Sequence, residues 1–549
     1  MTSHGSVPSL KFAFPPSRPF TALLLLGLAL SFFIWTVIGK DYQRGKYLEL
    51  HPRPDAVEYF AMARAMARGM PPQLEIAGEK LPSRYPPGFA VCQLPWIFSL
   101  KEGDAILAPL RTNQTIGILL LCGIFVWFWR EGKPLAGGFS ALLLATLPGF
   151  ITNSRSPMAD LCGATFVVFA FLALYSGWKH RQARWMYLAA VGLGLAFNVR
   201  YQLILFAPTL ALTVFLDSGG NWRRWWLHCV AVLLVFLACA SPALVLNQWQ
   251  FGNPFTTGYS FWIPDMTATD TTFAAHYLPE SLTLLGREFA QFPDRYRFAQ
   301  LYGTGIHFTP AFVLLALCGM ARRHPWPVIF CLGGGLLTFL LPTLFYFYQD
   351  SRIYLPLFLL ATVPAGLAAE QAVNRWIAGQ QRFRSLLVFL LVVGAVAGFP
   401  SMAGFPQRRS QVQLPYALGI FPHRDDRMSP ASYRAAIEFQ KRFGSSPGLV
   451  LSRISPVYLN AILPTDFVAA PIDGRHEYNH SRLWKYDVGS AQTLALFNLE
   501  KRRPVYALLT SEDGVETLPA ISGWHWNRLP SDSQRAVILR LEPAIAPRF

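Results

Sequence analysis

Long apolar runs separated by short polar segments make up most of the chain up to residue 402. A membrane-spanning helix needs about 20 consecutive apolar residues. The first run follows Lys11 and Arg18, is longer than the apolar part of a signal peptide and has no small-x-small cleavage site after it, so we expect it to remain as a span. Runs near the required length predict about eleven spans, at residues 20–38, 105–129, 134–152, 161–177, 185–199, 201–217, 227–246, 307–321, 326–347, 353–370 and 385–402.

The composition supports a membrane protein and argues against nucleic-acid binding. Charged residues are 14% of the chain, whereas a soluble protein has about 25%. The net charge of +17 comes from lysines and arginines in short clusters between apolar runs, which is typical of cytoplasmic loops beside anionic lipid. The seven cysteines lie almost all in apolar runs without a CxxC motif. We therefore expect free cysteines rather than a disulfide framework or a thiolate metal site.

The basic clusters also predict an orientation, because lysine and arginine accumulate in cytoplasmic loops. A cytoplasmic N-terminus places every short basic loop inside, namely those near 130 and at 179–184, 221–226, 321–324 and 374–385. The outer side then receives the loops 39–104 and 247–306 and everything after residue 402. Charge at membrane depth is costly, so ionisable residues gathered at this outer level predict a shared cavity. These residues are Arg155, Asp160, Arg200, Asp350 and Arg352.

One pair of apolar runs has two interpretations. Residues 185–217 form either two spans or one long helix broken around Asn198, Arg200 and Gln202. Both interpretations place Arg200 between two apolar halves on the outer side.

Residues 403–549 are more polar and predict a compact soluble α/β domain on the outer side. The segments GLVLSR, FVAAPI, PVYALLT and AVILRL are expected to be short buried strands. Helical patterns occur at 431–443, 455–463 and 490–503. The chain is therefore divided into a membrane domain, 1–402, and a soluble domain, 403–549.

The first outer loop brings acids, arginines and aromatic residues together. A helix is predicted for DAVEYFAMARAMAR, which begins directly after a proline. Asp55, Glu58 and Tyr59 share one face of this helix, and Arg64 and Arg68 lie on the opposite face. We expect the helix to rest on the membrane surface, with its acidic face toward the protein and its arginines toward lipid headgroups.

The acids have a structural alternative. Asp55 and Glu58 have the Asp-x-x-Glu spacing of a capping box, and Asp160 directly precedes a span, where an aspartate often caps the helix. For Asp55 and Asp160 the spacing is equally consistent with capping and with chemistry. For Glu58 a structural role is expected.

Several short motifs follow one another along the predicted spans. The helix that opens with Asp55 and contains Tyr59 is followed by GEKLPSRYPPGFAV, in which Arg84 and Tyr85 precede Pro-Pro-Gly. The segments SRSPMAD, which ends in Asp160, FGNPFTTGY and DSRIYLP come later. In this order they resemble the GT-C membrane glycosyltransferases, most closely the protein O-mannosyltransferase and lipid A aminoarabinose transferase group.

The resemblance covers about residues 10–400 and implies a GT-C fold with interfacial helices in the first outer loop. It implies an inverting hexosyl- or pentosyltransferase that moves a sugar from a polyprenyl-phosphate carrier to a hydroxyl of a lipid, glycan or protein. The site would lie at the outer face of a bacterial inner membrane. The segment Pro54-Asp55-Ala56 lacks the adjacent acidic pair of the family. No metal ligand is therefore assigned, and a divalent cation stays open as a cofactor.

The resemblance also implies residue roles. Asp55 would accept the proton of the acceptor hydroxyl, and Asp160 would orient Asp55's partner, hold the acceptor or hold a metal. Arginines would hold the donor phosphate; the alternative for them is a headgroup contact or an ion pair. Two tyrosines and Glu58 would line the substrate site, and the alternative for the tyrosines is anchoring at the membrane interface. These phosphate-binding and substrate-binding residues are Arg84, Arg200, Arg352, Tyr59, Tyr85 and Glu58.

Three other functions have weaker support in the sequence than the transferase. The HEYNH segment at 476–480 matches the zinc-binding His-Glu-x-x-His pattern, but its flanks are polar and Asp-Gly precedes it. A lipid or oligosaccharide transporter would be expected to show internal repeats and a midplane site, and the chain shows no repeat. An O-antigen ligase also has a large outer loop with arginines but does not need the Asp55 helix with its Tyr-Pro-Pro-Gly turn.

Overall fold

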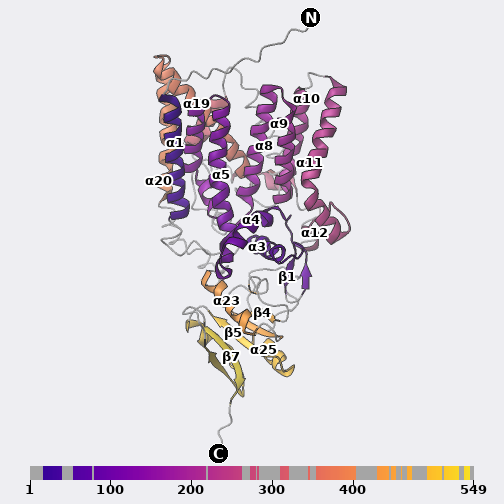
Figure 1. Ribbon diagram of the computed structural model, residues 1–549. Coiled ribbons are helices and arrows are strands. Elements are labelled where there is room, and N and C mark those ends of the chain that lie inside the picture. The colour runs from indigo at the N-terminus through magenta and orange to yellow at the C-terminus, as the bar shows by residue number, and fades with distance from the viewer. Residues whose placement is uncertain are drawn as a thin grey trace, which may run out of the picture.

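The computed structural model of the protein is mainly helical, with a five-stranded sheet in the C-terminal part of the chain. The long helices stand side by side as a bundle, and the sheet lies beyond one end of it (Figure 1). The described residues are 17–39, 54–76, 79–217, 221–262, 273–279, 281–283, 310–320, 344–345, 354–403, 430–443, 447–452, 459, 467–472, 491–509, 512–530 and 537–544.

The bundle confirms the helical architecture that the apolar runs predict. Every predicted span within the described residues is helical, and almost all of 326–347 lies outside them. Five helices are long and apolar enough to cross a membrane by length and composition, among the residues that the structure describes. The bundle elements are α1 (Ser17–Phe33), η1 (Ile34–Gly39), α5 (Ala108–Arg130), α6 (Pro134–Thr146), α7 (Pro148–Ser154), α8 (Asp160–His180), α9 (Ala183–Val199), η3 (Tyr201–Phe206), α10 (Ala207–Asp217), α11 (Trp222–Phe251), α16 (Pro310–Met320), α19 (Leu355–Ile377) and α20 (Arg382–Ala403).

Helix α9 ends immediately before Arg200, whose backbone is extended with φ −151° and ψ 121°. Asn198 fixes this end of the helix: its Oδ1 accepts the backbone N–H of Ala243 at 2.9 Å, and its Nδ2 donates to the carbonyl of Gly194 at 3.0 Å. The apolar residues 185–217 are therefore broken at Arg200, between α9 and η3. The start of α8 lies at the same end of the bundle, because Asp160 is ion-paired with Arg200.

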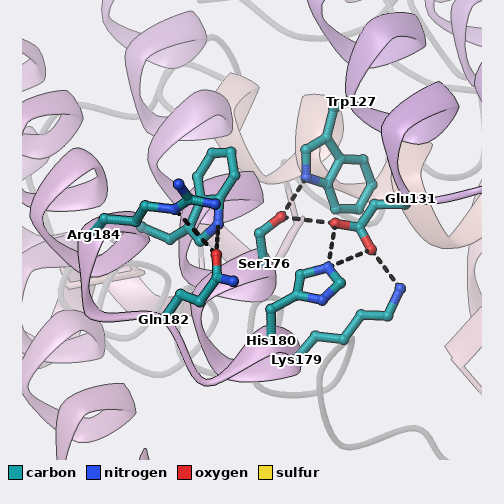
Figure 2. Close-up of polar contacts among 8 residues, drawn as sticks. Trp127, Glu131, Ser176, Lys179, His180, Gln182 and Arg184 are labelled. Carbon is teal, nitrogen blue, oxygen red and sulfur yellow. Dashed lines mark hydrogen bonds and ion pairs between the residues drawn. The ribbon is translucent and has the colours of Figure 1, made fainter. Parts of the chain in front are cut away.

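At the other end of the bundle, α5 and α8 are joined by a polar cluster around Glu131 (Figure 2). The Glu131 carboxylate accepts a hydrogen bond from Ser176 Oγ at 3.0 Å, lies 3.1 Å from His180 Nε2 and forms an ion pair with Lys179. Trp127 Nε1 donates to Ser176 Oγ at 2.9 Å. Helix α8 has 21 residues, so this cluster lies about 30 Å from the first residue of α8.

A layer of short elements lies between the bundle and the sheet (Figure 1). The helix predicted in the first outer loop is present as α3, and a short hairpin after it pairs Leu74 with Leu81. The hairpin was not predicted because strands of three residues leave almost no periodic pattern. The elements are α3 (Pro54–Ala67), β1 (Leu74–Ile76), β2 (Glu79–Leu81), α4 (Gly88–Ser99), η2 (Glu102–Leu107), α12 (Gly258–Trp262) and η5 (Ala275–Tyr277).

Helix α3 is buried in protein instead of resting on lipid with one face. The Arg64 side chain is buried, and its guanidinium carbon lies 5.8 Å from the ring centroid of Phe60 and 5.9 Å from that of Tyr433. Tyr433 belongs to the C-terminal part of the chain, which covers this face. The expected contact of Arg64 with lipid headgroups is therefore wrong, whereas Arg68 is exposed.

The C-terminal part forms a mixed sheet in the order β4-β3-β5-β7-β6. Strand β3 is parallel to β4 and β5, and β7 is antiparallel to β5 and β6. The four predicted strands are confirmed, but edge strand β6 was not predicted, because none of its side chains is buried and the segment contains no apolar run. The helical pattern at 455–463 lies almost wholly outside the described residues, and the division of the chain at 402 stays a prediction. The elements are α23 (Pro430–Phe443), β3 (Gly448–Ser452), β4 (Phe467–Pro471), α25 (Ala491–Glu500), β5 (Val505–Leu509), η9 (Glu512–Thr517), β6 (Trp524–Leu529) and β7 (Val537–Pro543).

Helix α23 joins the sheet to α3. The rings of Phe60 and Tyr433 meet edge to face at 5.7 Å between centroids, within one apolar cluster that runs from α3 into the sheet. At the border of this cluster, Arg434 Nη2 lies 2.6 Å from Asp104 Oδ1. The face of α3 that carries Phe60 thus completes the core of the C-terminal part.

Candidate active site

Glu58 and Arg84 form a buried polar pair within the described part of the first outer loop. Glu58 Oε2 accepts hydrogen bonds from Ser83 Oγ and from the backbone N–H of Arg84, each at 2.9 Å. Glu58 Oε1 accepts from Arg84 Nε at 2.5 Å and is ion-paired with the same guanidinium. Both carboxylate oxygens therefore hold the turn at residues 83–84 against α3, which supports a structural role for Glu58.

Asp55 lies beside this pair, at the start of α3. Its Oδ1 is 3.7 Å from Arg84 Nη2, and its side chain is 16% exposed against 7% for Arg84. The capping-box alternative for Asp55 needs Glu58 to turn back along α3, and Glu58 is instead directed at Ser83 and Arg84. Asp55 is therefore a partly accessible carboxylate with a guanidinium beside it.

Buried phenols surround these charges. The rings of Tyr59 and Tyr85 lie 4.7 Å apart, and Tyr85 meets Tyr259 edge to face at 5.6 Å. Burial raises the pKa of all three phenols, and the charge of Asp55 raises it further. They are therefore neutral hydroxyls at ordinary pH, able to donate hydrogen bonds.

Asp160 and Arg200 form a second ion pair, between the start of α8 and the break after α9. The alternative interpretation of Asp160 as an N-cap is wrong, because α8 begins at Asp160 with Ala159 at the cap position and no side-chain cap bond. Burial raises the pKa of the Tyr59 phenol, the charge of Arg200 offsets part of this rise, and the charge of Asp55 adds to it. Both ion pairs, Asp55–Arg84 and Asp160–Arg200, therefore place a charge close enough to affect the Tyr59 phenol.

Two glycines allow the segments of the site to approach this closely. A Cβ at Gly88, the glycine of the Tyr-Pro-Pro-Gly turn, would lie 2.4 Å from the carbonyl oxygen of Asn198, two residues before Arg200. A Cβ at Gly258 would lie 1.9 Å from the carbonyl oxygen of Ser83. Larger residues at these positions would separate the first outer loop from the α9 break and from α12.

The structure thus brings together most of the residues predicted for the site. An apolar cluster contains Tyr59 and Tyr85 together with Ala159 and Val199, which directly precede Asp160 and Arg200. Arg352 and the HEYNH segment lie outside the described residues. Within the described part of the chain, no group of three His, Cys, Asp or Glu side chains is placed to hold a metal ion.

Two contributors to the site were not predicted. Tyr259 contacts Tyr85, and Ser83 bridges Glu58 and the backbone N–H of Tyr85, the latter at 3.1 Å. Tyr259 lies in the FGNPFTTGY motif and Ser83 directly precedes Arg84, so both belong to motifs that carry the family resemblance. What the motifs could not indicate is that these segments touch.

Comparisons with known proteins bear on the fold and on the region around α8 and α9. A family model described as dolichyl-phosphate-mannose-protein mannosyltransferase matches residues 102–246, which include Asp160 and Arg200. The chain is similar to the crystal structure of ArnT from Cupriavidus metallidurans bound to undecaprenyl phosphate, with a TM-score of 0.55 and 14% identity over 95% of this chain and 98% of that chain. The apo crystal structure of that ArnT gives a TM-score of 0.52 with the same identity and coverage. No curated protein sequence matches the chain. At this identity the likeness establishes a shared fold.

Proposed function

We propose that this chain, which has the GT-C fold of the ArnT structures, transfers a sugar from a polyprenyl-phosphate carrier to a hydroxyl group of an acceptor. The expectation of a GT-C fold, made from the order of the motifs, is confirmed. The carrier is proposed because one matched structure holds undecaprenyl phosphate and the matched family model is described by a dolichyl-phosphate sugar. The acceptor class, whether lipid, glycan or protein, is left open by the fold.

The observation that carries the proposal is the accessible carboxylate of Asp55 beside the buried Arg84 and the neutral phenols. In the proposed step, Asp55 takes the proton of the acceptor hydroxyl as that oxygen bonds to the anomeric carbon. The bond from the anomeric carbon to the phosphate oxygen breaks, and the polyprenyl phosphate leaves with that electron pair. Such a displacement inverts the anomeric centre, and a positioned base contributes about 10²- to 10⁴-fold.

The leaving phosphate requires cations nearby. Arg200 is the stronger candidate, because its side chain is 13% exposed while its partner Asp160 is 3% exposed. The Arg84 guanidinium is less available to a phosphate, because Glu58 and Asp55 both lie against it. We therefore assign Arg84 first to orienting Asp55, and second to the phosphate. Arg352 stays a prediction.

Orientation and location belong to the same proposal. The basic residues between α5 and α6, and between α8 and α9, lie at the end of the bundle opposite Asp55, where Lys179 meets Glu131. The positive-inside rule then places that end in the cytoplasm. The site and the C-terminal part would face the outer side of a bacterial inner membrane, where a lipid-carried donor can reach Asp55.

The test is transfer by the purified full-length protein in detergent, with a labelled sugar on undecaprenyl phosphate and a set of lipid, glycan and protein acceptors. The expected result is labelled product of inverted anomeric configuration, released together with undecaprenyl monophosphate. Turnover in detergent, with no compartment on either side, also separates this function from transport. Absence of product from every acceptor, with intact donor recovered, would contradict the proposal. A requirement for a diphosphate carrier would favour a ligase.

A further inference from the structure

We propose that Cys92 and Cys162 form a disulfide that links α4 to α8 in the mature protein. The structure places their two Sγ atoms 3.8 Å apart, both as free thiols. Cys92 lies in the middle of α4 and Cys162 in the first turn of α8. Of the six cysteines within the described residues, these are the two whose thiols contact each other.

The two sulfurs lie near bonding distance. The S–S bond is about 2.05 Å long, so sulfurs that are 3.8 Å apart need to approach by less than about 2 Å. The thiols come from different helices and are separated by 70 positions in the chain. This separation explains why cysteine spacing gave no signal, and the crosslink would tie two segments that are distant in sequence.

The crosslink would lie directly under the proposed site. Helix α4 begins at Gly88, just after Arg84 and Tyr85, and α8 begins at Asp160. Cys162 belongs to the apolar cluster that contains Tyr59 and Tyr85, and Cys92 packs against this cluster. A bond between these sulfurs would therefore fix the distance between the turn that carries Arg84 and the start of α8, where Asp160 pairs with Arg200.

The proposal rests on the outward orientation given above, because disulfides persist outside the cytoplasm. Cys92 is partly exposed and Cys162 is fully buried, so Cys92 reacts first. Its thiolate attacks a sulfur of an external disulfide, such as that of a dithiol oxidoreductase, and one thiolate of the oxidant leaves. The Cys162 thiolate then attacks the Cys92 sulfur and releases the second thiolate. The two protein thiols lose two protons and two electrons, and the oxidant accepts the electrons.

The test is to denature the full-length protein directly from cells in excess N-ethylmaleimide and to map its peptides by mass spectrometry without reductant. The expected result is one crosslinked peptide pair containing Cys92 and Cys162, with Cys122 alkylated. Cys92→Ser should abolish the crosslink and leave Cys162 alkylated, whereas the matched Cys122→Ser should keep the crosslink. Alkylation of both Cys92 and Cys162 in the unmodified protein would overturn the proposal.

A second measurement tests whether the two thiols can bond to each other, independently of the cellular compartment in which they lie. Purified full-length protein is reduced, then treated with oxidised glutathione. The expected product has lost two hydrogens, and its unfolding midpoint rises by a few degrees in the original chain but not in Cys92→Ser. A stable glutathione adduct on Cys92 without a crosslink would overturn the geometry. Sugar transfer by the reduced protein tests the proposed function separately. The disulfide proposal can therefore fail while the proposed function holds, and the reverse.

Discussion

The two ends of helix α8 each carry a carboxylate ion pair, in contrasting surroundings. At the first residue, Asp160 pairs with Arg200, and both side chains are largely buried beside the aromatic centre of the proposed site. At the last turn, Lys179 and His180 approach Glu131; these two partners are 36% and 42% exposed, while the Glu131 side chain itself is 7% exposed. Solvent therefore screens the charges of the two partners. Both members of the Asp160–Arg200 pair are shielded from solvent, whereas in the second cluster the carboxylate is shielded and its partners are not.

Protonation behaves differently at the two ends as well. Burial opposes ionisation of Glu131, but hydrogen bonds from Lys179 and His180 outweigh it and lower the pKa of Glu131. Its contribution to stability is therefore present above its usual pKa and lost as pH falls through the lowered value. At the site end, burial raises the pKa of Tyr59 and Tyr85. Their contribution is lost only as pH rises past the usual phenol pKa, near 10.

Removal of a buried partner should have the largest effect on stability. Arg84→Met leaves the buried carboxylate of Glu58 without its cation, so the free energy of unfolding should fall by about 3–5 kcal/mol. Lys179→Met at the opposite end removes a partner that is 36% exposed and leaves Glu131 its contacts with Ser176 and His180, so it should cost less, about 1 kcal/mol. Chemical denaturation in detergent measures both. Equal losses at the two ends would remove the contrast between them.

Loss of the contact between α23 and α3 should come next. Tyr433→Ala removes a ring that packs against Phe60 and Arg64, and should cost about 3 kcal/mol. It should also slow sugar transfer, because α3 carries Asp55. Tyr433→Phe keeps the ring and should change both quantities little. Slow transfer by Tyr433→Phe would indicate that the hydroxyl, not the packing, matters.

A methyl group at the close approach between α4 and α9 should have an intermediate effect. Gly88→Ala places a Cβ against the carbonyl of Asn198 and should cost about 1–3 kcal/mol. The matched control is Gly27→Ala in α1, where nothing lies within 4 Å of the added Cβ. This control should be neutral or slightly stabilising. A neutral Gly88→Ala would show that the two segments can separate without loss.

Local patterns predicted the elements of the fold and the separate pieces of the site. Apolar runs identified the bundle helices, and the Asp55 helix with the Arg84–Tyr85 turn was recognised from short motifs. What they could not predict were contacts between distant segments. Arg64 was assigned to lipid because nothing near it in sequence indicates that Tyr433 covers it. A capping role fitted Asp160 equally well until its partner, 40 positions away, was known.

Change at the cluster around Glu131 should have the smallest effect. Glu131→Gln removes the ion pair but keeps a hydrogen-bond acceptor, so it should cost at most about 1 kcal/mol near neutral pH and leave sugar transfer unchanged. Because the pKa of Glu131 is lowered from 4.5, the difference from the original chain should shrink as pH falls below that value. Unfolding curves at pH 7 and pH 4 measure this. A difference that grows toward low pH would have the wrong sign.

The most direct measurement is the single-turnover rate of sugar transfer by Asp55→Asn. Asparagine keeps the size of the side chain but accepts a proton poorly, so the rate should fall by about 10²- to 10⁴-fold at an unchanged protein level. Asp104→Asn alters an acid outside the site, in the contact with Arg434, and should transfer within about twofold of the original rate. Transfer by Asp55→Asn at the original rate, from normally folded protein, would contradict the account.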